Sequence, residues 1–199
     1  QNGTPKVKFK RIWDEKEKRL TIQASQSNPI KKNQYNNLPL IIPINLAIFC
    51  GENKKIEKTV VLKTKIQNFI FKNVESHLPI PLVTYFREFS SPVDWESDTT
   101  LDEKYLILKY EKDFFTISNT VRLFYKNIIA CRLDEKPNYK IENKLIGTLK
   151  SFLKNKDINL SLLSELLSMP NFAEIESEME NIDPLKIYKT IDELNNLFG

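Results

Sequence analysis

Residues 69–93 read F-I-F-K-N-V-E-S-H-L-P-I-P-L-V-T-Y-F-R-E-F-S-S-P-V. The apolar residues on either side of Pro79 and Pro81 predict two strands. The prolines separate these strands because proline has no amide proton for a sheet ladder. The single histidine of the chain, His77, lies between them. This stretch therefore predicts the last strands of a β-domain and the connection that leaves it.

Further short strands are predicted upstream of this stretch, where apolar and polar residues alternate with the period of a half-buried strand. Turn residues such as Asn36-Asn37 separate them. The predicted strands are residues 7–12, 20–26, 40–49, 56–64, 68–71, 81–87 and 93–95. Several short strands at this spacing predict an antiparallel β-sandwich over residues 1–97.

The apolar spacing becomes helical after residue 97, so residues 98–199 are predicted to be all-helical. Thr100 and Glu103 have the spacing of a capping box. The start and stop signals, in chain order, are Thr100, Asp113, Pro137-Asn138, Asp157, Pro170 and Asp183-Pro184. The fold class is therefore multi-domain β then α: a sandwich followed by an α-solenoid or bundle-like segment.

The last predicted helix carries an apolar face at the end of the chain. Its residues are Met179, Ile182, Leu185, Ile187, Ile191, Leu194, Leu197 and Phe198. A solenoid normally closes with a polar cap. We therefore expect this face to pack on a further helix of a longer protein or on a neighbouring copy, and the helical domain to be incomplete.

The formal net charge of +4 matches the excess in residues 1–20, which hold seven basic and three acidic side chains. Such an excess is compatible with a nucleic-acid patch. The alternation Lys6-Val7-Lys8-Phe9-Lys10 instead favours a charged hairpin with one solvated face. We therefore predict no nucleic-acid partner.

No membrane or secretory segment is predicted. The longest apolar run, residues 38–50, is too short and too interrupted by proline to span a bilayer. Cys50 and Cys131 lie in apolar surroundings without a partner at metal or redox spacing. Buried, reduced thiols and a cytoplasmic location are the expectation. The chain begins at Gln1 rather than Met, and we expect it to be a piece of a longer protein.

No catalytic, cofactor-binding or metal-ligating residue is predicted. A His-Glu-x-x-His zinc helix needs two histidines, and this chain has one. His77 is interpreted as a loop or core histidine, and a Cys–His nucleophile built on Cys50 or Cys131 is disfavoured because both thiols look structural. The acidic pairs and clusters are predicted on solvated surfaces: Asp102/Glu103, Asp134/Glu135 and Glu174/Glu176/Glu178/Glu180. Four glycines cannot form a phosphate loop.

Arg87 and Glu88, between Phe86 and Phe89, are the most suggestive charged pair. One interpretation is an ordinary strand-end pair that contributes little. The other is a clamp between domains, because the pair lies just before the predicted change from strands to helices.

Six segments, in order, resemble the aminopeptidase N family of zinc metallopeptidases, and the bacterial-type enzyme most of all. They are residues 1–5, 20–26, 38–44, 69–93, Asp113-Phe114 and 181–184. Residues 87–93 are similar to the family's Arg-x-Phe-Ser-Ala-Pro-Val, with Ser91 in place of Ala, and residues 84–86 replace smaller aliphatic residues.

The resemblance implies a parent enzyme that removes N-terminal residues from peptides with one zinc ion. This chain would supply its small β-sandwich and the first helices of its C-terminal domain, as an interdomain scaffold without zinc or catalytic residues. The implied partners are the catalytic domain and the remaining C-terminal helices, with peptide substrate bound by the parent only. The alternative is an independent β-sandwich binding or adhesion module with a helical appendage.

Overall fold

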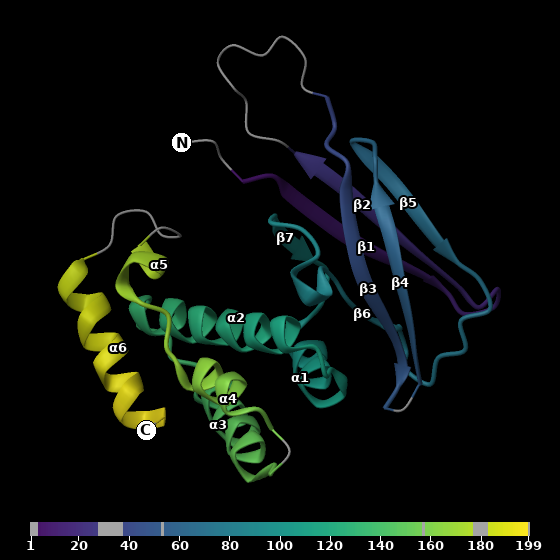
Figure 1. Cartoon of the computed structure of the whole chain (residues 1–199). Coiled ribbons are helices and arrows are strands. Elements are labelled where there is room, and N and C mark those ends of the chain that lie inside the picture. Colours follow the sequence, from purple (N-terminus) through teal and green to yellow (C-terminus); the bar gives the residue numbers. More distant parts are fainter. Residues whose placement is uncertain (1–3, 28–37, 53, 157, 177–182, 199) are drawn as a thin grey trace. The chain divides into compact units, whose positions relative to one another are not determined.

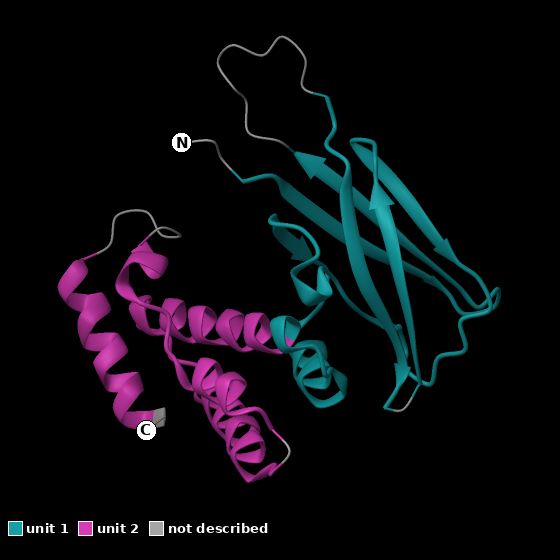
Figure 2. Ribbon diagram, viewed as in Figure 1, with its two compact units in different colours: residues 1–116 teal, residues 117–199 magenta. Residues whose placement is uncertain are grey.

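The computed structural model describes residues 4–27, 38–52, 54–156, 158–176 and 183–198 (Figure 1). The chain divides into two compact units, Gln1–Thr116 and Ile117–Gly199 (Figure 2). Each unit is described by itself. The boundary between domains at residues 97 and 98 stays a prediction. No helix among the described residues is long and apolar enough to cross a membrane.

The first unit is a sandwich of two sheets. Its strands are β1 (Lys6–Asp14), β2 (Arg19–Ser27), β3 (Ile42–Gly51), β4 (Lys54–Leu62), β5 (Ile66–Phe71), β6 (Leu82–Thr84) and β7 (Asp94–Ser97). One sheet has the order β5-β2-β1-β7 and the other β4-β3-β6. Neighbouring strands are antiparallel except for β1 and β7, which pair in parallel. The predicted sandwich is confirmed.

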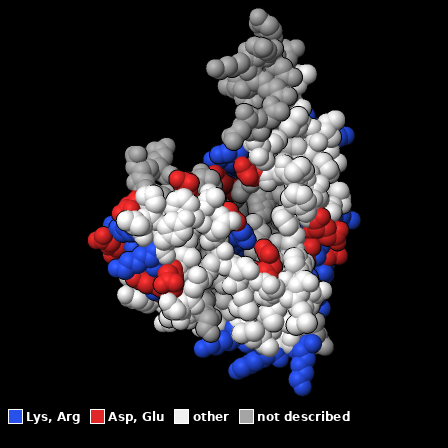
Figure 3. Space-filling model, turned by 60° about the vertical axis from the view of Figure 1, so that its left-hand side comes forward, with Lys and Arg blue, Asp and Glu red and all other residues white. Residues whose placement is uncertain are grey.

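Alternation along the hairpin of β1 and β2 places one apolar set between the sheets. Val7 and Phe9 are buried, whereas the lysines between and beside them are exposed. The solvated face predicted for the hairpin is therefore confirmed for these lysines. Figure 3 shows basic and acidic side chains side by side on part of the face that it draws, and some basic side chains at its lower edge without an acidic neighbour.

Residues 46–50 of strand β3 are buried on both faces, because helix α1 (Leu101–Tyr110) packs against the outer face there. Ile44, Leu46, Ile48 and Cys50 face the core between the sheets. Ala47 and Phe49 point the other way and form a second apolar cluster with Leu82. Leu106 and Tyr110 of α1 pack against that cluster. Helix α1 is therefore part of the first unit and covers the outer face of this sheet.

The capping box predicted at the start of α1 is present. The Thr100 hydroxyl accepts from the Glu103 amide, and the Glu103 carboxylate accepts from the Thr100 amide at 2.8 Å. These two reciprocal bonds satisfy amide donors that a helix start leaves open.

The strand predicted over residues 81–87 is wrong in its second half. Strand β6 ends at Thr84, Phe86 has a φ of 54°, and a 3₁₀ turn, η1, covers Arg87–Phe89. A left-handed residue cannot continue an extended ladder. The chain therefore turns three residues earlier than the apolar pattern indicates.

The second unit is all-helical, as predicted. Its helices are α2 (Phe114–Leu133), whose first three residues fall in the first unit, α3 (Tyr139–Lys154), α4 (Leu160–Leu167), α5 (Phe172–Glu176) and α6 (Pro184–Phe198). The core of this unit includes Val121, Phe124, Ile128, Leu145, Leu149, Leu166, Ile187 and Leu194.

The helix boundaries differ in part from those predicted. Asp183 caps α6 as expected, with its Oδ1 accepting from the Leu185 amide at 2.9 Å. The predicted start at Asp157 lies outside the described residues. Helix α4 is capped instead by Asn159, whose side chain accepts from the Ser161 amide at 2.7 Å. Helix α5 was not predicted.

The apolar face expected on α6 is divided between core and surface. Ile187 and Leu194 are buried, but Leu185 is 77% exposed and Leu197 45% exposed. Met179, Ile182 and the side chain of Phe198 lie outside the described part of the structure. Packing of this face on a further helix stays a prediction.

Candidate functional site

His77 lies in the segment between β5 and β6, where its side chain is exposed. Its backbone amide donates to the Cys50 carbonyl at 2.8 Å. This is the loop position that the sequence predicted. Among the residues that the structure describes, no group of three His, Cys, Asp or Glu side chains could hold a metal ion. These residues do not fit a zinc site, and the absence of catalytic residues from the chain stays a prediction.

Both cysteines are free thiols. Cys50 is buried in the sandwich core, and burial raises the pKa of its thiol despite the nearby charge of Lys54. Cys131, on α2, is only half-buried, so the prediction of a buried thiol is wrong for this residue. The prediction rested on the apolar residues around Cys131 in the sequence. Those neighbours do not show how much of the thiol is exposed.

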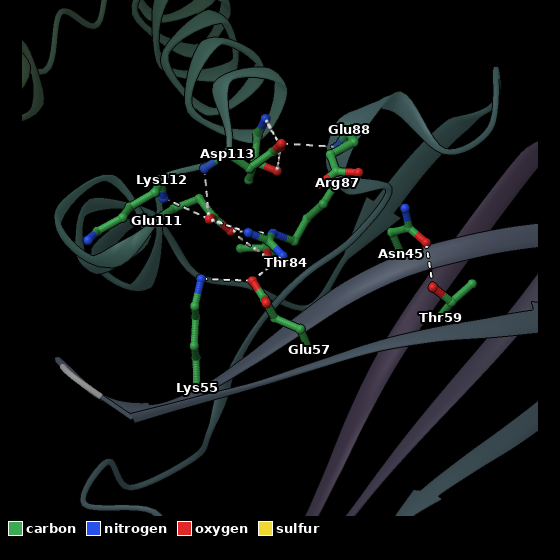
Figure 4. A network of polar contacts seen from close by, with 11 residues as sticks. Asn45, Lys55, Glu57, Thr59, Thr84, Arg87, Glu88, Glu111, Lys112 and Asp113 are labelled. Atoms are coloured by element: carbon green, nitrogen blue, oxygen red, sulfur yellow. Dashed lines mark hydrogen bonds and ion pairs between the residues drawn. The ribbon is translucent and has the colours of Figure 1, made fainter.

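The candidate site is a polar network around Glu111, the residue that ends α1 (Figure 4). Its side chain is 0% exposed. Arg87 of η1 donates from Nε to Glu111 Oε2 at 3.1 Å and from its terminal nitrogen to Oε1 at 3.1 Å. Thr84, the last residue of β6, donates to Oε2 at 2.9 Å. Arg87 also binds Glu57, as described below. We call Thr84, Arg87, Glu111 and Glu57 the Glu111 network.

The same carboxylate shapes the connection between α1 and α2. Glu111 Oε1 accepts from the amides of Lys112 at 2.7 Å and Asp113 at 2.9 Å. Asp113 in turn caps α2 by accepting from the Thr116 amide at 2.8 Å. The predicted cap at Asp113 is thus confirmed, and Glu111 holds the turn in which that cap is formed.

Arg87 extends the network to the sandwich. It donates to Glu57 of β4 at 2.6 Å, and Lys55 lies 2.7 Å from the same carboxylate. Hydrogen bonds from Lys55 and Arg87 hold the pKa of Glu57 below its ordinary value. Burial alone would lower the pKa of Arg87, but Glu111 and Glu57 outweigh it and the pKa is raised.

Arg87 and Glu88 do not work as a pair. Arg87 bonds to Glu111 and Glu57, whereas Glu88 contributes its backbone amide, which donates to Asp113 Oδ1 at 3.1 Å. The prediction of a strand-end pair is wrong because no strand reaches these residues. The interpretation of the pair as a clamp between domains stays a prediction. Sequence reasoning did not identify Glu111, whose only local signal is its place at the end of a predicted helix.

Two departures from the family pattern have polar roles here. Thr84 donates to Glu111, as described above. Ser91 is 7% exposed, and its hydroxyl donates to the Pro43 carbonyl at 2.6 Å. The two hydroxyls therefore tie the end of β6 and the segment that follows it to their surroundings.

A second network surrounds Arg11 of β1, which is 8% exposed. Its Nε donates to Asp98 Oδ1 at 2.8 Å, and its two terminal nitrogens donate to the two oxygens of Glu103, both at 2.9 Å. Such two-pronged pairs are among the stronger ionic contacts in proteins. Tyr85, whose ring is stacked on that of Phe9 with 3.9 Å between the centroids, lies within electrostatic reach of these charges. We call Arg11, Asp98 and Glu103 the Arg11 network.

The Arg11 network was missed by sequence reasoning, which treated residues 1–20 as a charged hairpin with one solvated face and placed Glu103 on a solvated surface. The sequence did contain a signal. Side chains alternate between the two faces of a strand, and Arg11 follows Val7 and Phe9 at a spacing of two, so it shares their inward face. Burial alone would raise the pKa of Glu103, but the bonds from Arg11 and Thr100 outweigh it and the pKa is lowered.

The two networks perform attachment rather than acid–base chemistry. In each, an arginine from the sandwich side is paired with a carboxylate of α1, at opposite ends of that helix. A general acid or base needs a proton that it can exchange with substrate. Both Glu103 and Glu111 are instead bonded to arginine and to backbone amides. Together with the apolar cluster under α1, the networks fix this helix at both ends.

Comparisons with known proteins agree with this architecture. Residues 3–98 match the family described as "Domain of unknown function (DUF3458) Ig-like fold". Residues 101–199 match the family described as "Domain of unknown function (DUF3458_C) ARM repeats". The chain is 24% identical to aminopeptidase N of Escherichia coli (strain K12) over an alignment of 199 residues, which covers 94% of this chain. The chain belongs to the aminopeptidase N family.

A second member of the aminopeptidase N family, from Haemophilus influenzae, is 22% identical over 198 residues and 92% of this chain. The chain spans 22% of the length of each of these two relatives. The crystal structure of Legionella pneumophila aminopeptidase A in complex with aspartic acid has the same fold over 98% of this chain and 22% of its own, with a TM-score of 0.78 and 18% identity.

Proposed function

We propose that this chain is a non-catalytic scaffold: the β-sandwich and first C-terminal helices of a zinc-dependent aminopeptidase. Two aminopeptidase N relatives support the proposal, since this chain matches about a fifth of their length. The proposed role is to set the position of the helical domain against the catalytic domain of the longer protein.

The observation that carries the scaffold role is the attachment of α1 to the sandwich. An arginine–carboxylate network holds each end of this helix, and Phe49, Leu82 and Leu106 pack in an apolar cluster along it. The Glu111 network also fixes the turn from which α2 begins. Rigid attachment at both ends is what a spacer between domains requires.

The zinc ion and the peptide substrate are proposed to bind elsewhere in the longer protein, and that protein is proposed to be cytoplasmic. The partners of this chain are then the catalytic domain and the remaining helices of the C-terminal domain. The family resemblance supports the zinc ion, the peptide substrate and these partners, and the names of the relatives support a peptidase.

The alternative, an independent binding or adhesion module, is less well supported. Both halves of this chain match one continuous part of the same relatives, in the same order. A free-standing sandwich with an unrelated appendage would not give that continuity.

Reading the coding DNA upstream of the Gln1 codon tests the proposal. We expect an open frame that encodes His-Glu-x-x-His followed by a further glutamate, the ligand set that one zinc ion uses in such peptidases. A start codon immediately before the Gln1 codon would contradict the scaffold proposal and favour the independent module.

A further inference from the structure

The backbone of residues 86–89 is unusual for a segment without glycine. Phe86, Glu88 and Phe89 have φ values of 54°, 57° and 52°. Left-handed backbone is unfavourable for residues with a Cβ, and glycine normally occupies such positions. Six described non-glycine residues have positive φ, and three of them lie within these four positions. The others, Lys18, Asn73 and Glu135, occur singly.

Contacts on both sides of the segment hold this conformation. Phe86 is buried, with its ring 5.7 Å from the ring of Phe9 and 5.8 Å from that of Trp95. Arg87, between the left-handed residues, is bound to Glu111 and Glu57. Strained backbone persists where the surrounding structure over-determines it, and it marks segments that can switch.

The second half of the segment, Glu88 and Phe89, is held by fewer contacts. Glu88 is exposed, and its amide donates to Asp113 Oδ1 at 3.1 Å. Phe89 is 57% exposed and contacts Phe115 edge-on at 5.2 Å. Packing of these two side chains cannot compensate for two strained residues, because both are largely in solvent. The bonds of Arg87 to buried Glu111 are the strongest contacts that oppose relaxation of the turn.

We propose that residues 86–89 form a strained latch, which the Arg87–Glu111 pair holds closed. When the pair is broken, the turn relaxes to an ordinary right-handed or extended backbone. The Glu88 amide then leaves Asp113, and the cap that Asp113 provides to α2 through Thr116 is weakened. A role for the latch in the longer protein depends on the proposed scaffold function. There it would control the stability of the first turn of α2.

Comparing Glu88→Gly with Glu88→Ala in the 199-residue chain measures the strain directly. Both substitutions remove the same exposed carboxylate, but only glycine adopts left-handed backbone without strain. We expect Glu88→Gly to melt about 2–4 °C above Glu88→Ala when Glu111 is present.

The same comparison in a Glu111→Gln background tests the latch. With the pair broken, the turn is free to relax, and we expect the advantage of glycine over alanine to disappear. An advantage that is equal in both backgrounds would overturn the proposal, because the strain would then not depend on Glu111. Absence of any advantage with Glu111 intact would overturn it as well.

A milder background keeps the test decisive if Glu111→Gln does not fold. Thr84→Val removes the hydroxyl that donates to Glu111 Oε2 and leaves Arg87 in place. We expect the advantage of glycine to shrink, with faster amide exchange at Glu88, Lys112 and Asp113; unchanged values would count against the latch. These measurements involve no peptidase activity, so failure of the latch and failure of the scaffold proposal are separate results.

Discussion

At the scale of single residues, Glu111 joins the end of a strand to the turn between two helices. Its carboxylate accepts two hydrogen bonds from Arg87, one from Thr84 and two from backbone amides. Exposed ion pairs contribute little because water and salt screen them. A fully buried carboxylate differs, since removal of its charge leaves several donors without their acceptor.

Glu111→Gln is therefore expected to lower the free energy of unfolding by about 3 kcal/mol, as breaking a buried ion pair does. Urea denaturation followed by circular dichroism measures this change. The matched control is Glu75→Gln, which removes a carboxylate whose partners Lys18 and Lys54 are exposed. We expect the control to be unchanged. Equal effects at the two positions would show that the network does not stabilise the chain.

The Arg11 network predicts a pH dependence. The pKa of Glu103 is lowered in the folded chain, so the unfolded chain binds its proton first as pH falls. The stability from this group is therefore complete above the ordinary glutamate pKa of about 4.3 and is lost as pH falls through the lower native value.

Glu103→Gln tests this dependence, because the substitution removes the titrating group. The difference in unfolding free energy between wild type and Glu103→Gln is expected to be constant above about pH 5 and to shrink towards pH 3. Urea titrations across this range measure it. A difference that stays constant to pH 3 would mean that Glu103 is not an ionised partner of Arg11.

At the scale of elements, sequence reasoning succeeded where local periodicity decides the outcome. Alternation located β1 to β5, and side-chain caps located the starts of α1, α2 and α6. It failed at the end of β6, because the left-handed Phe86 follows from tertiary contacts. It missed α5, which has five residues and too few apolar positions for a helical period.

The networks could not be predicted as pairs, for a related reason. Arg11 and Glu103 are separated by 92 residues, and Arg87 and Glu111 by 24. No local pattern brings such partners together, because the fold of the whole first unit sets their distance. The alternation of side chains along β1 would have placed Arg11 on the inward face. It does not identify the carboxylate that pairs with Arg11.

The apolar cluster under α1 predicts a selective effect of Phe49→Ala. Phe49 is 1% exposed, so the substitution should cost about 3–5 kcal/mol of unfolding free energy. Because Phe49 faces α1, the amides of residues 101–110 should lose protection first in native-state hydrogen exchange. Ile44→Ala, on the opposite face of β3, is the control and should spare α1. Equal loss in both variants would contradict a separate cluster.

The divided face of α6 gives a second prediction at this scale. Leu194→Ala should lower the free energy of unfolding by about 2–5 kcal/mol, because Leu194 is fully buried. Leu185→Ala should change it by less than about 0.5 kcal/mol in this chain, because Leu185 is 77% exposed. Thermal unfolding compares the two variants. A large effect at Leu185 would show that this residue is already covered in the isolated chain.

At the scale of the whole molecule, the chain combines an Ig-like sandwich and a helical segment that together match 22% of the length of aminopeptidase N relatives. The Arg11 and Glu111 networks hold the two ends of α1, and His77 lies in an exposed loop. We therefore propose that the chain contributes attachment and spacing to a longer peptidase, and that the chemistry lies in the rest of that protein.

The most direct measurement is the hydrolysis of a chromogenic aminoacyl substrate by the full-length gene product and by this 199-residue chain, each with added zinc. We predict turnover by the full-length protein and none above buffer by the chain alone. Turnover by the chain that survives His77→Ala, or a zinc-loaded full-length protein without turnover, would contradict the account.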